Sequence, residues 1–201
     1  MIKSKREALT KRWALFCAGN QFTDKDFVYR GQIIRNEDFR RRDYEKANIQ
    51  FCSVLHTNLS GSRIRDRGAF IGNGWYGCSF SGSDYSGIRM VMEEYKGCVL
   101  GNSVFRYVQM VELQAEGCNY TGSRWYDSEF CKCAFRGCCF RKTGFLRGRI
   151  DETTFLDCVF DEALLEGTEL SGVIFRNCFF RAQKEERPDG CSFQNCTFEK
   201  C

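Results

Sequence analysis

A large apolar residue recurs at every fifth position from Phe70 to Phe180, and this feature constrains the fold more than any other. Apolar positions would repeat about every 3.6 residues in a helix and every 2 residues in an ordinary strand. A period of five therefore indicates that each five-residue unit turns a corner and returns the chain to one shared axis. Only Ala115 is small in this series. Its members are Phe70, Trp75, Phe80, Tyr85, Met90, Tyr95, Leu100, Phe105, Met110, Ala115, Tyr120, Trp125, Phe130, Phe135, Phe140, Phe145, Ile150, Phe155, Phe160, Leu165, Leu170, Phe175 and Phe180.

A second period of twenty residues supports the same geometry. Twenty residues are four units, so the chain should close one four-sided coil every twenty residues. A repeat of fixed length that stacks only on its neighbours is a solenoid, and its coils should rise by about 4.8 Å. Six cysteines follow this period and should form one column: Cys78, Cys98, Cys118, Cys138, Cys158 and Cys178.

Individual units carry a recognisable motif. Residues 78–82 read CSFSG and residues 83–87 read SDYSG, and residues 57–61 (TNLSG) and 118–122 (CNYTG) are further copies. The sequence resembles the pentapeptide-repeat family over residues 47–201, with its motif of a small residue, a polar residue, Leu or Phe, a polar residue, and Gly or a polar residue. This resemblance implies an all-β fold, a right-handed quadrilateral β-helix, and the handedness rests on the resemblance alone.

Two breaks in the period divide the chain. The step from Ile64 to Phe70 is six residues, which predicts a register shift at 65–69 that bulges or bends the solenoid. The step from Phe180 to Phe193 is thirteen residues, which predicts an inserted loop at 183–190 that projects from a corner. We expect the β-helix over 29–201 and a basic N-terminal capping segment over 1–28, with a short helix from Ile2 to Ala18.

Several units have the wrong residue at the inward small position. Gln32, Glu37 and Arg42 occupy it near the start, so we expect loosely formed first coils. Asn73 and Glu93 occupy it later, where they predict local distortion.

Fourteen cysteines would suggest disulfides in a small secreted chain. Here eleven of them fall on inward small positions, where cysteine acts as a small buried hydrophobe, so we expect reduced thiols and a cytoplasmic protein. The run CKCAFRGCC at 131–139 resembles a zinc ligand set, but its cysteines should point to different sides of the coil. No metal and no cofactor are therefore expected.

Catalytic groups are scarce in this sequence. The single histidine, His56, stands at an outward position beside no obvious partner and is expected to be a solvated surface residue. No phosphate-cradling glycine loop appears. We predict no enzyme activity, no catalytic residue and no small-molecule substrate.

Charge is banded along the sequence. Residues 131–149 carry six basic and no acidic side chains, and residues 150–172 carry seven acidic and no basic ones. Side chains twenty residues apart should be stacked neighbours, so the bands should form ladders of opposite charge. The predicted pairs are Glu112–Lys132, Glu116–Arg136, Asp127–Arg147, Glu129–Arg149, Lys132–Glu152, Arg141–Asp161, Lys142–Glu162, Arg149–Glu169 and Asp161–Arg181.

The family resemblance implies a protein-interaction role. The Qnr quinolone-resistance group of this family binds type II topoisomerases such as DNA gyrase, partly through a DNA-like acidic rod, and an inserted loop matters for protection. The candidate loop contacts are Lys184, Glu185, Glu186, Arg187 and Asp189. The candidate acidic surface consists of Asp151, Asp157, Asp161, Glu162 and Glu166.

Other readings stay open. The net charge is +4, whereas the DNA mimics are usually acidic, so the partner can be another host or bacterial protein, as for a secreted effector or a phage or mobile-element product. Residues 1–50 hold twelve basic and seven acidic side chains, densest at Arg40–Arg42, which keeps direct nucleic-acid or membrane-surface binding as a weaker alternative. The last unit, with Phe198 and Cys201, suggests a homodimer through one end of the solenoid.

Overall fold

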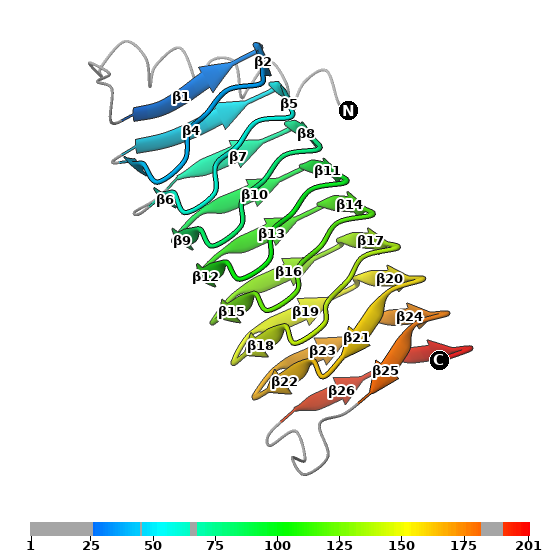
Figure 1. The fold of residues 1–201 in the computed structure, drawn as a ribbon. Helices are drawn as coiled ribbons and strands as arrows, with labels where there is room; N and C mark the ends of the chain where they lie inside the picture. The colour runs from blue at the N-terminus through cyan, green and yellow to red at the C-terminus, as the bar shows by residue number, and fades with distance from the viewer. Residues whose placement is uncertain (1–25, 45, 65–67, 182–190) are drawn as a thin grey trace, which may run out of the picture.

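The computed structural model describes residues 26–44, 46–64, 68–181 and 191–201, and these residues form a four-sided parallel β-solenoid (Figure 1). Each five-residue unit supplies one side of a coil, and every strand pairs with strands one coil before or after it. We number the four faces in chain order. The all-β solenoid predicted from the five-residue period is confirmed.

The first and second faces are each a sheet of nine parallel strands. The first face consists of β1 (Asp26–Arg30), β4 (Lys46–Gln50), β7 (Ala69–Ile71), β10 (Arg89–Val91), β13 (Gln109–Val111), β16 (Glu129–Cys131), β19 (Arg149–Asp151), β23 (Glu169–Ser171) and β26 (Ser192–Gln194). The second face consists of β2 (Ile33–Arg35), β5 (Ser53–Leu55), β8 (Gly74–Tyr76), β11 (Glu94–Lys96), β14 (Gln114–Glu116), β17 (Ala134–Arg136), β20 (Thr154–Leu156), β24 (Ile174–Arg176) and β27 (Thr197–Glu199).

The third and fourth faces are less regular. The third face is held by single parallel bridges from Asp38 through Asn58, Ser79 and Val99 onward, and by the pair β21 (Val159–Asp161) and β25 (Phe179–Arg181). The fourth face is a seven-stranded sheet. It consists of β3 (Asp43–Tyr44), β6 (Arg63–Ile64), β9 (Asp84–Ser86), β12 (Val104–Arg106), β15 (Arg124–Tyr126), β18 (Gly144–Leu146) and β22 (Leu164–Glu166).

Aromatic and aliphatic side chains of the five-residue series fill the interior of the tube. Phe80 and Phe140 are 1% exposed and Phe160 is 4% exposed. Rings one coil apart stack, with centroids 4.9 Å apart between Tyr120 and Phe140 and 5.0 Å apart between Phe140 and Phe160. Such ring pairs add about 0.5–1.5 kcal/mol each beyond the burial of apolar area. The shared apolar axis is therefore the core of this fold.

The six cysteines predicted to form a column are all buried. Five of these thiols donate to backbone carbonyls of the preceding coil, as from Cys178 Sγ to the oxygen of Phe155 at 3.4 Å, whereas Cys118 Sγ donates to the oxygen of Glu116. Serine and threonine do the same at the next corner, where Ser103 Oγ donates to the oxygen of Phe80 at 2.7 Å. A small donor at the inward position thus satisfies a corner carbonyl, and larger apolar residues could not.

The two breaks in the period change the pairing offset. Phe70 pairs with Met90 at the standard twenty residues, whereas Ile49 pairs with Phe70, which is twenty-one. Leu170 pairs with Phe193, which is twenty-three. The second break therefore lengthens that coil by only three residues and not by eight. Residues 65–67 and 182–190 themselves lie outside the described residues.

The first coil differs from expectation. Ile34, Phe39 and Tyr44 are buried, and β1 pairs with β4 over five residues, so this coil is not loosely formed. Its apolar central residues suffice because strand pairing does not depend on the inward small position. Strand β1 begins at Asp26, inside the segment assigned to the cap. The predicted helix from Ile2 to Ala18 lies outside the described residues.

Candidate functional sites on the solenoid surface

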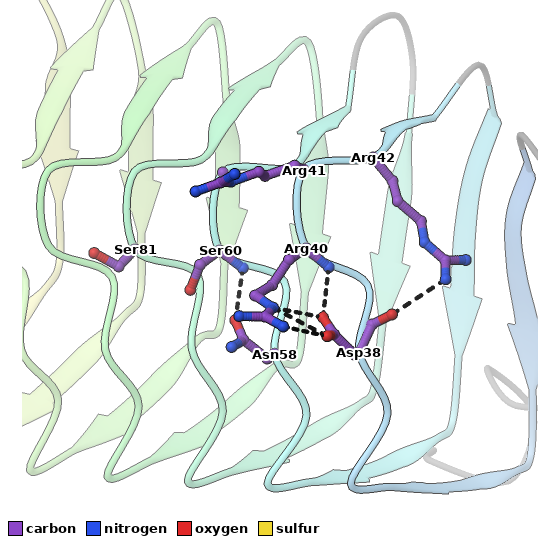
Figure 2. A pocket seen from close by; sticks show the side chains of 8 residues that line it. Asp38, Arg40, Arg41, Arg42, Asn58, Ser60 and Ser81 are labelled. Atoms are coloured by element: carbon purple, nitrogen blue, oxygen red, sulfur yellow. Dashed lines mark hydrogen bonds and ion pairs between the residues drawn. The ribbon is translucent and has the colours of Figure 1, made fainter.

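A polar pocket of about 820 Å³ lies at the N-terminal end of the third face (Figure 2). It forms where the turn after Phe39 carries three consecutive arginines and the turns of the next two coils carry small residues. The lining residues are Asp38, Arg40, Arg41, Arg42, Asn58, Ser60, Gly61 and Ser81.

The one carboxylate of this pocket is already engaged. Asp38 Oδ1 accepts a hydrogen bond from the backbone N–H of Arg40 at 3.1 Å, and Oδ2 lies 2.6 Å from Arg40 Nη2. The hydrogen bonds from Arg40 lower the pKa of Asp38 to about 2. Arg40 and Asp38 therefore neutralise each other and fix the turn.

Arg41 and Arg42 point in opposite directions along the solenoid (Figure 2). Arg41 has a left-handed backbone (φ 56°) and lies over Gly61, where an added Cβ would be 3.3 Å from Arg41 Cγ. Figure 2 shows its side chain running toward Ser60 and Ser81. Arg42 turns back, donates from Nη2 to the carbonyl oxygen of Asp38 at 3.2 Å, and lies over the ring of Phe39.

The candidate acidic surface is largely neutralised. Asp161 is only 4% exposed and lies between Arg141 and Arg181, at 3.1 Å and 2.6 Å. Glu162 lies 3.4 Å from Lys142 and 3.8 Å from Arg181.

The remaining acidic residues of that surface differ in exposure. Asp151 pairs with Arg149 at 2.6 Å. Asp157 is exposed and accepts a hydrogen bond from Asn177 Nδ2 at 2.6 Å, and Glu166 is exposed on β22. Of the five residues of the candidate acidic surface, Asp157 and Glu166 are the two that form no ion pair with the described residues.

The predicted charge ladders are confirmed in register. Strand pairing aligns Glu116 with Arg136 and Glu129 with Arg149. Four of the nine predicted pairs form no ion pair among the described residues: Glu112–Lys132, Glu116–Arg136, Glu129–Arg149 and Arg149–Glu169. Arg149 turns along its own strand to Asp151 instead. Ion pairs within 4.0 Å form between Asp127 and Arg147, Lys132 and Glu152, Arg141 and Asp161, Lys142 and Glu162, and Asp161 and Arg181.

Glu93 and Asn73 form a buried polar network, not the local distortion that the sequence suggested. Glu93 Oε1 accepts from the backbone N–H and the Nδ2 of Asn73, both at 3.0 Å, and Oε2 accepts from Trp75 Nε1 at 2.6 Å. Asn73 Nδ2 also donates to the oxygen of Ile49 at 2.8 Å. Burial raises the pKa of Glu93 to about 8 despite these three donors.

The other predicted site residues lie in the inserted loop, at the C-terminal end of the described solenoid and at a corner. The loop residues Lys184, Glu185, Glu186, Arg187 and Asp189 lie outside the described residues. At the C-terminal end of the described solenoid, Phe198 is 52% exposed and Cys201 is exposed. His56 is exposed at a corner of the second face.

Two kinds of feature are absent from the described residues. No group of three or more His, Cys, Asp or Glu side chains there is arranged to hold a metal ion. No helix in that part of the chain has the length and apolar character needed to cross a bilayer.

Comparison with known proteins places the fold. No family model matches the sequence, and no curated protein matches it either. Among solved structures, full-length QnrB1, described as a plasmid-mediated fluoroquinolone resistance protein, aligns with a TM-score of 0.50 at 12% identity over 83% of this chain and 93% of QnrB1. HetL, a pentapeptide-repeat protein from the cyanobacterium Nostoc sp. PCC 7120, aligns with a TM-score of 0.33 at 10% identity over 92% of this chain and 90% of HetL.

Proposed function

We propose that this chain, which has the β-solenoid fold of the pentapeptide-repeat proteins, is a non-enzymatic protein-interaction rod that binds DNA gyrase, a type II topoisomerase. The observation that carries the proposal is the rod itself. Its interior is filled by packed rings, and its outward side chains stand in registered rows about one strand spacing apart. A surface of this kind suits recognition of an extended partner, and the likeness in fold to a fluoroquinolone resistance protein directs the choice to gyrase.

A supercoiling assay tests this proposal. Purified gyrase would be assayed with and without a fluoroquinolone while this protein is titrated in. We expect protection from the drug or inhibition of supercoiling, in proportion to the protein added. Deleting Gln183–Gly190 should abolish the effect. A double charge reversal, Asp127→Arg with Arg147→Asp, keeps an ion pair on a different corner and should leave the effect unchanged.

The ion pairing of the acidic band favours a second candidate, an interaction rod for a different protein partner. Asp161 and Glu162 are bound to cations of neighbouring coils, so they present little free negative charge to a DNA-binding groove. If the intact protein leaves gyrase unaffected even in large molar excess, the topoisomerase proposal is wrong and this second candidate stands.

We also propose a homodimer through the C-terminal end of the described solenoid. Phe180, Phe193 and Phe198 are 39%, 47% and 52% exposed there, and among the described strands β26 and β27 each pair on one side only. Exposed aromatic surface beside open strand edges favours association. Light scattering over a concentration series should give twice the chain mass, and Phe198→Ser should return it toward one. A constant monomeric mass for the unsubstituted chain would contradict the dimer.

We propose that the protein resides in the cytoplasm, because its described cysteines are free thiols. Each of the thirteen cysteines in the described residues is a free thiol, and most are buried at inward positions. Thiol counting of the native and unfolded protein purified from cells should recover all of them as reduced. Recovery of disulfides would argue for an oxidising compartment.

A further inference from the structure

We propose that the pocket around Arg41 is a binding site for a phosphate group, either free or carried on a nucleotide. This site is separate from the acidic band, the loop and the end of the rod used above. The inference starts from the charge of the lining. Three guanidinium groups and one carboxylate give 3 − 1, a net charge of +2, and the other lining residues are uncharged.

Arg41 is the charged residue of this pocket whose side chain is available to bind a ligand. Asp38 is occupied by Arg40, and Arg42 is turned away to the Asp38 carbonyl. The backbone N–H of Arg41 donates to the oxygen of Ser60 at 3.0 Å, but its side chain makes no hydrogen bond or ion pair with the described residues and lies along the face (Figure 2). Its five N–H donors therefore face the pocket without a protein acceptor.

The position of Arg41 in the repeat makes this arrangement unusual. The equivalent corner positions in later coils are Gly61, Gly82, Asn102 and Gly122, all with positive φ, which glycine and asparagine tolerate best. Lys142 and Glu162 occupy the same corner further on, but they pair with each other at 3.4 Å. Arg41 shares this left-handed backbone with the rest of the column, but its charged side chain has no ion pair among the described residues.

The floor of the pocket supplies neutral donors. Asn58 accepts from the backbone N–H of Ser60 with Oδ1 at 3.0 Å, which leaves its amide N–H groups for a ligand. Ser60 Oγ and Ser79 Oγ lie 2.7 Å apart, and since only one of them donates to the other, the second hydroxyl keeps a proton to offer. Gly61 adds no side chain, so the Arg41 side chain can pass over it toward Ser81.

This donor set fits a phosphate better than a carboxylate. A guanidinium binds two oxygens of an oxyanion in its plane. A tetrahedral phosphate then has further oxygens directed out of that plane toward Asn58 and the serine hydroxyls. A planar carboxylate bound to Arg41 would leave those floor donors without an acceptor.

NMR titration tests the site directly. Inorganic phosphate or AMP would be added to the labelled full-length chain while backbone amide and arginine Nε–H signals are followed, with chloride holding ionic strength constant. We expect saturable shifts at Arg41 Nε–H and at the amides of Ser60 and Gly61. Equal affinity for the two probes identifies free phosphate as sufficient, and tighter binding of AMP identifies a nucleotide-borne phosphate.

Two substitutions with the same change in net charge separate a site from general attraction. Arg41→Gly installs the residue that later coils carry at this corner, so the fold should persist, and binding should weaken at least tenfold. Arg35→Gln, on β2 of the second face, should change affinity less than twofold. Equal loss in both variants, shifts that do not saturate, or equally tight binding of acetate or an oligoglutamate peptide would overturn the proposal.

Discussion

The buried carboxyl of Glu93 shows how one residue can be unfavourable for the fold and still be accommodated. Three donors converge on its two oxygens, which favours the ionised form. Complete burial beside the aromatic core disfavours that form, and the raised pKa shows that burial has the larger effect. The network around Glu93 is therefore sensitive to pH within the range at which proteins are usually handled.

Stability should fall as pH rises because of this residue. Between its ordinary pKa of 4.5 and its folded pKa of about 8, the folded state holds a proton that the unfolded state has lost. The free energy of unfolding should then decrease by up to about 1.4 kcal/mol per pH unit across that window, and not change further above it. Urea unfolding from pH 5 to pH 9 measures the slope.

Glu93→Gln should remove this slope, because no proton can then be lost. Its neighbour provides the control: Glu94 faces outward, and its pKa is lowered by hydrogen bonds from Lys96 and Tyr76. Glu94→Gln should therefore leave the slope of pH 5 to 8 intact. The same slope in Glu93→Gln as in the unsubstituted chain would show that Glu93 titrates normally.

Among the strands and turns, ion pairs between stacked coils contribute different amounts to stability, depending on how deeply they are buried. Asp127 and Arg147 form a two-pronged contact at 3.1 Å and 3.0 Å on the surface, and exposed pairs of this kind contribute about 0–1 kcal/mol. Asp161 instead joins β21 to β25 while its own side chain is only 5% exposed. Its hydrogen bonds to charged donors should be stronger, at roughly 1.5–3 kcal/mol each.

Asp161→Asn should therefore destabilise the fold by roughly 1–3 kcal/mol, since the arginines can still hydrate after the charge is lost. Asp127→Asn should cost less than about 1 kcal/mol. Chemical unfolding in low and high salt compares them, and salt should diminish the Asp127 effect more. Equal effects of the two substitutions would mean that burial of Asp161 does not matter.

The strands themselves could be predicted because the period of five is local and unbroken over most of the chain. The ladders of Lys132, Arg141 and Lys142 followed from the same arithmetic. The Glu93 network could not be predicted in this way, because polar residues at two inward positions give no sign of which donors meet. The turn of Arg149 toward Asp151 likewise depends on a side-chain rotamer, which periodicity does not determine.

For the whole molecule, each coil touches only the coils beside it, so stability should be close to a sum over coils. Removing residues 99–118 deletes twenty residues and preserves every face. We expect a folded, shorter rod with a modestly lower melting temperature. Removing residues 99–103 deletes one unit, moves each later side chain by one face, and should lower the melting temperature far more or prevent folding. Circular dichroism during heating distinguishes these outcomes.

The coil between Leu170 and Phe193 is three residues longer than the standard twenty, and this affects the molecule as a whole. The sequence predicted an inserted loop of eight residues at 183–190, because counting residues does not reveal how far apart the strands before and after a break are paired. Pairing of Leu170 with Phe193 shows that β26 returns to the first face twenty-three residues after β23. An interruption can therefore be absorbed within one coil while the next coil returns to register.

From β4 onward, each described strand on the first, second and fourth faces pairs in parallel with one that lies about twenty residues earlier, and this has a consequence during synthesis. A nascent chain leaving the ribosome needs no segment that is still to be translated in order to add its next coil, because the surface that templates it is already complete. Folding can then proceed by adding coils one after another to the C-terminal end of the part that is already folded. The addition of β26 is the step most prone to error, because more residues must be synthesised before this strand can pair with β23.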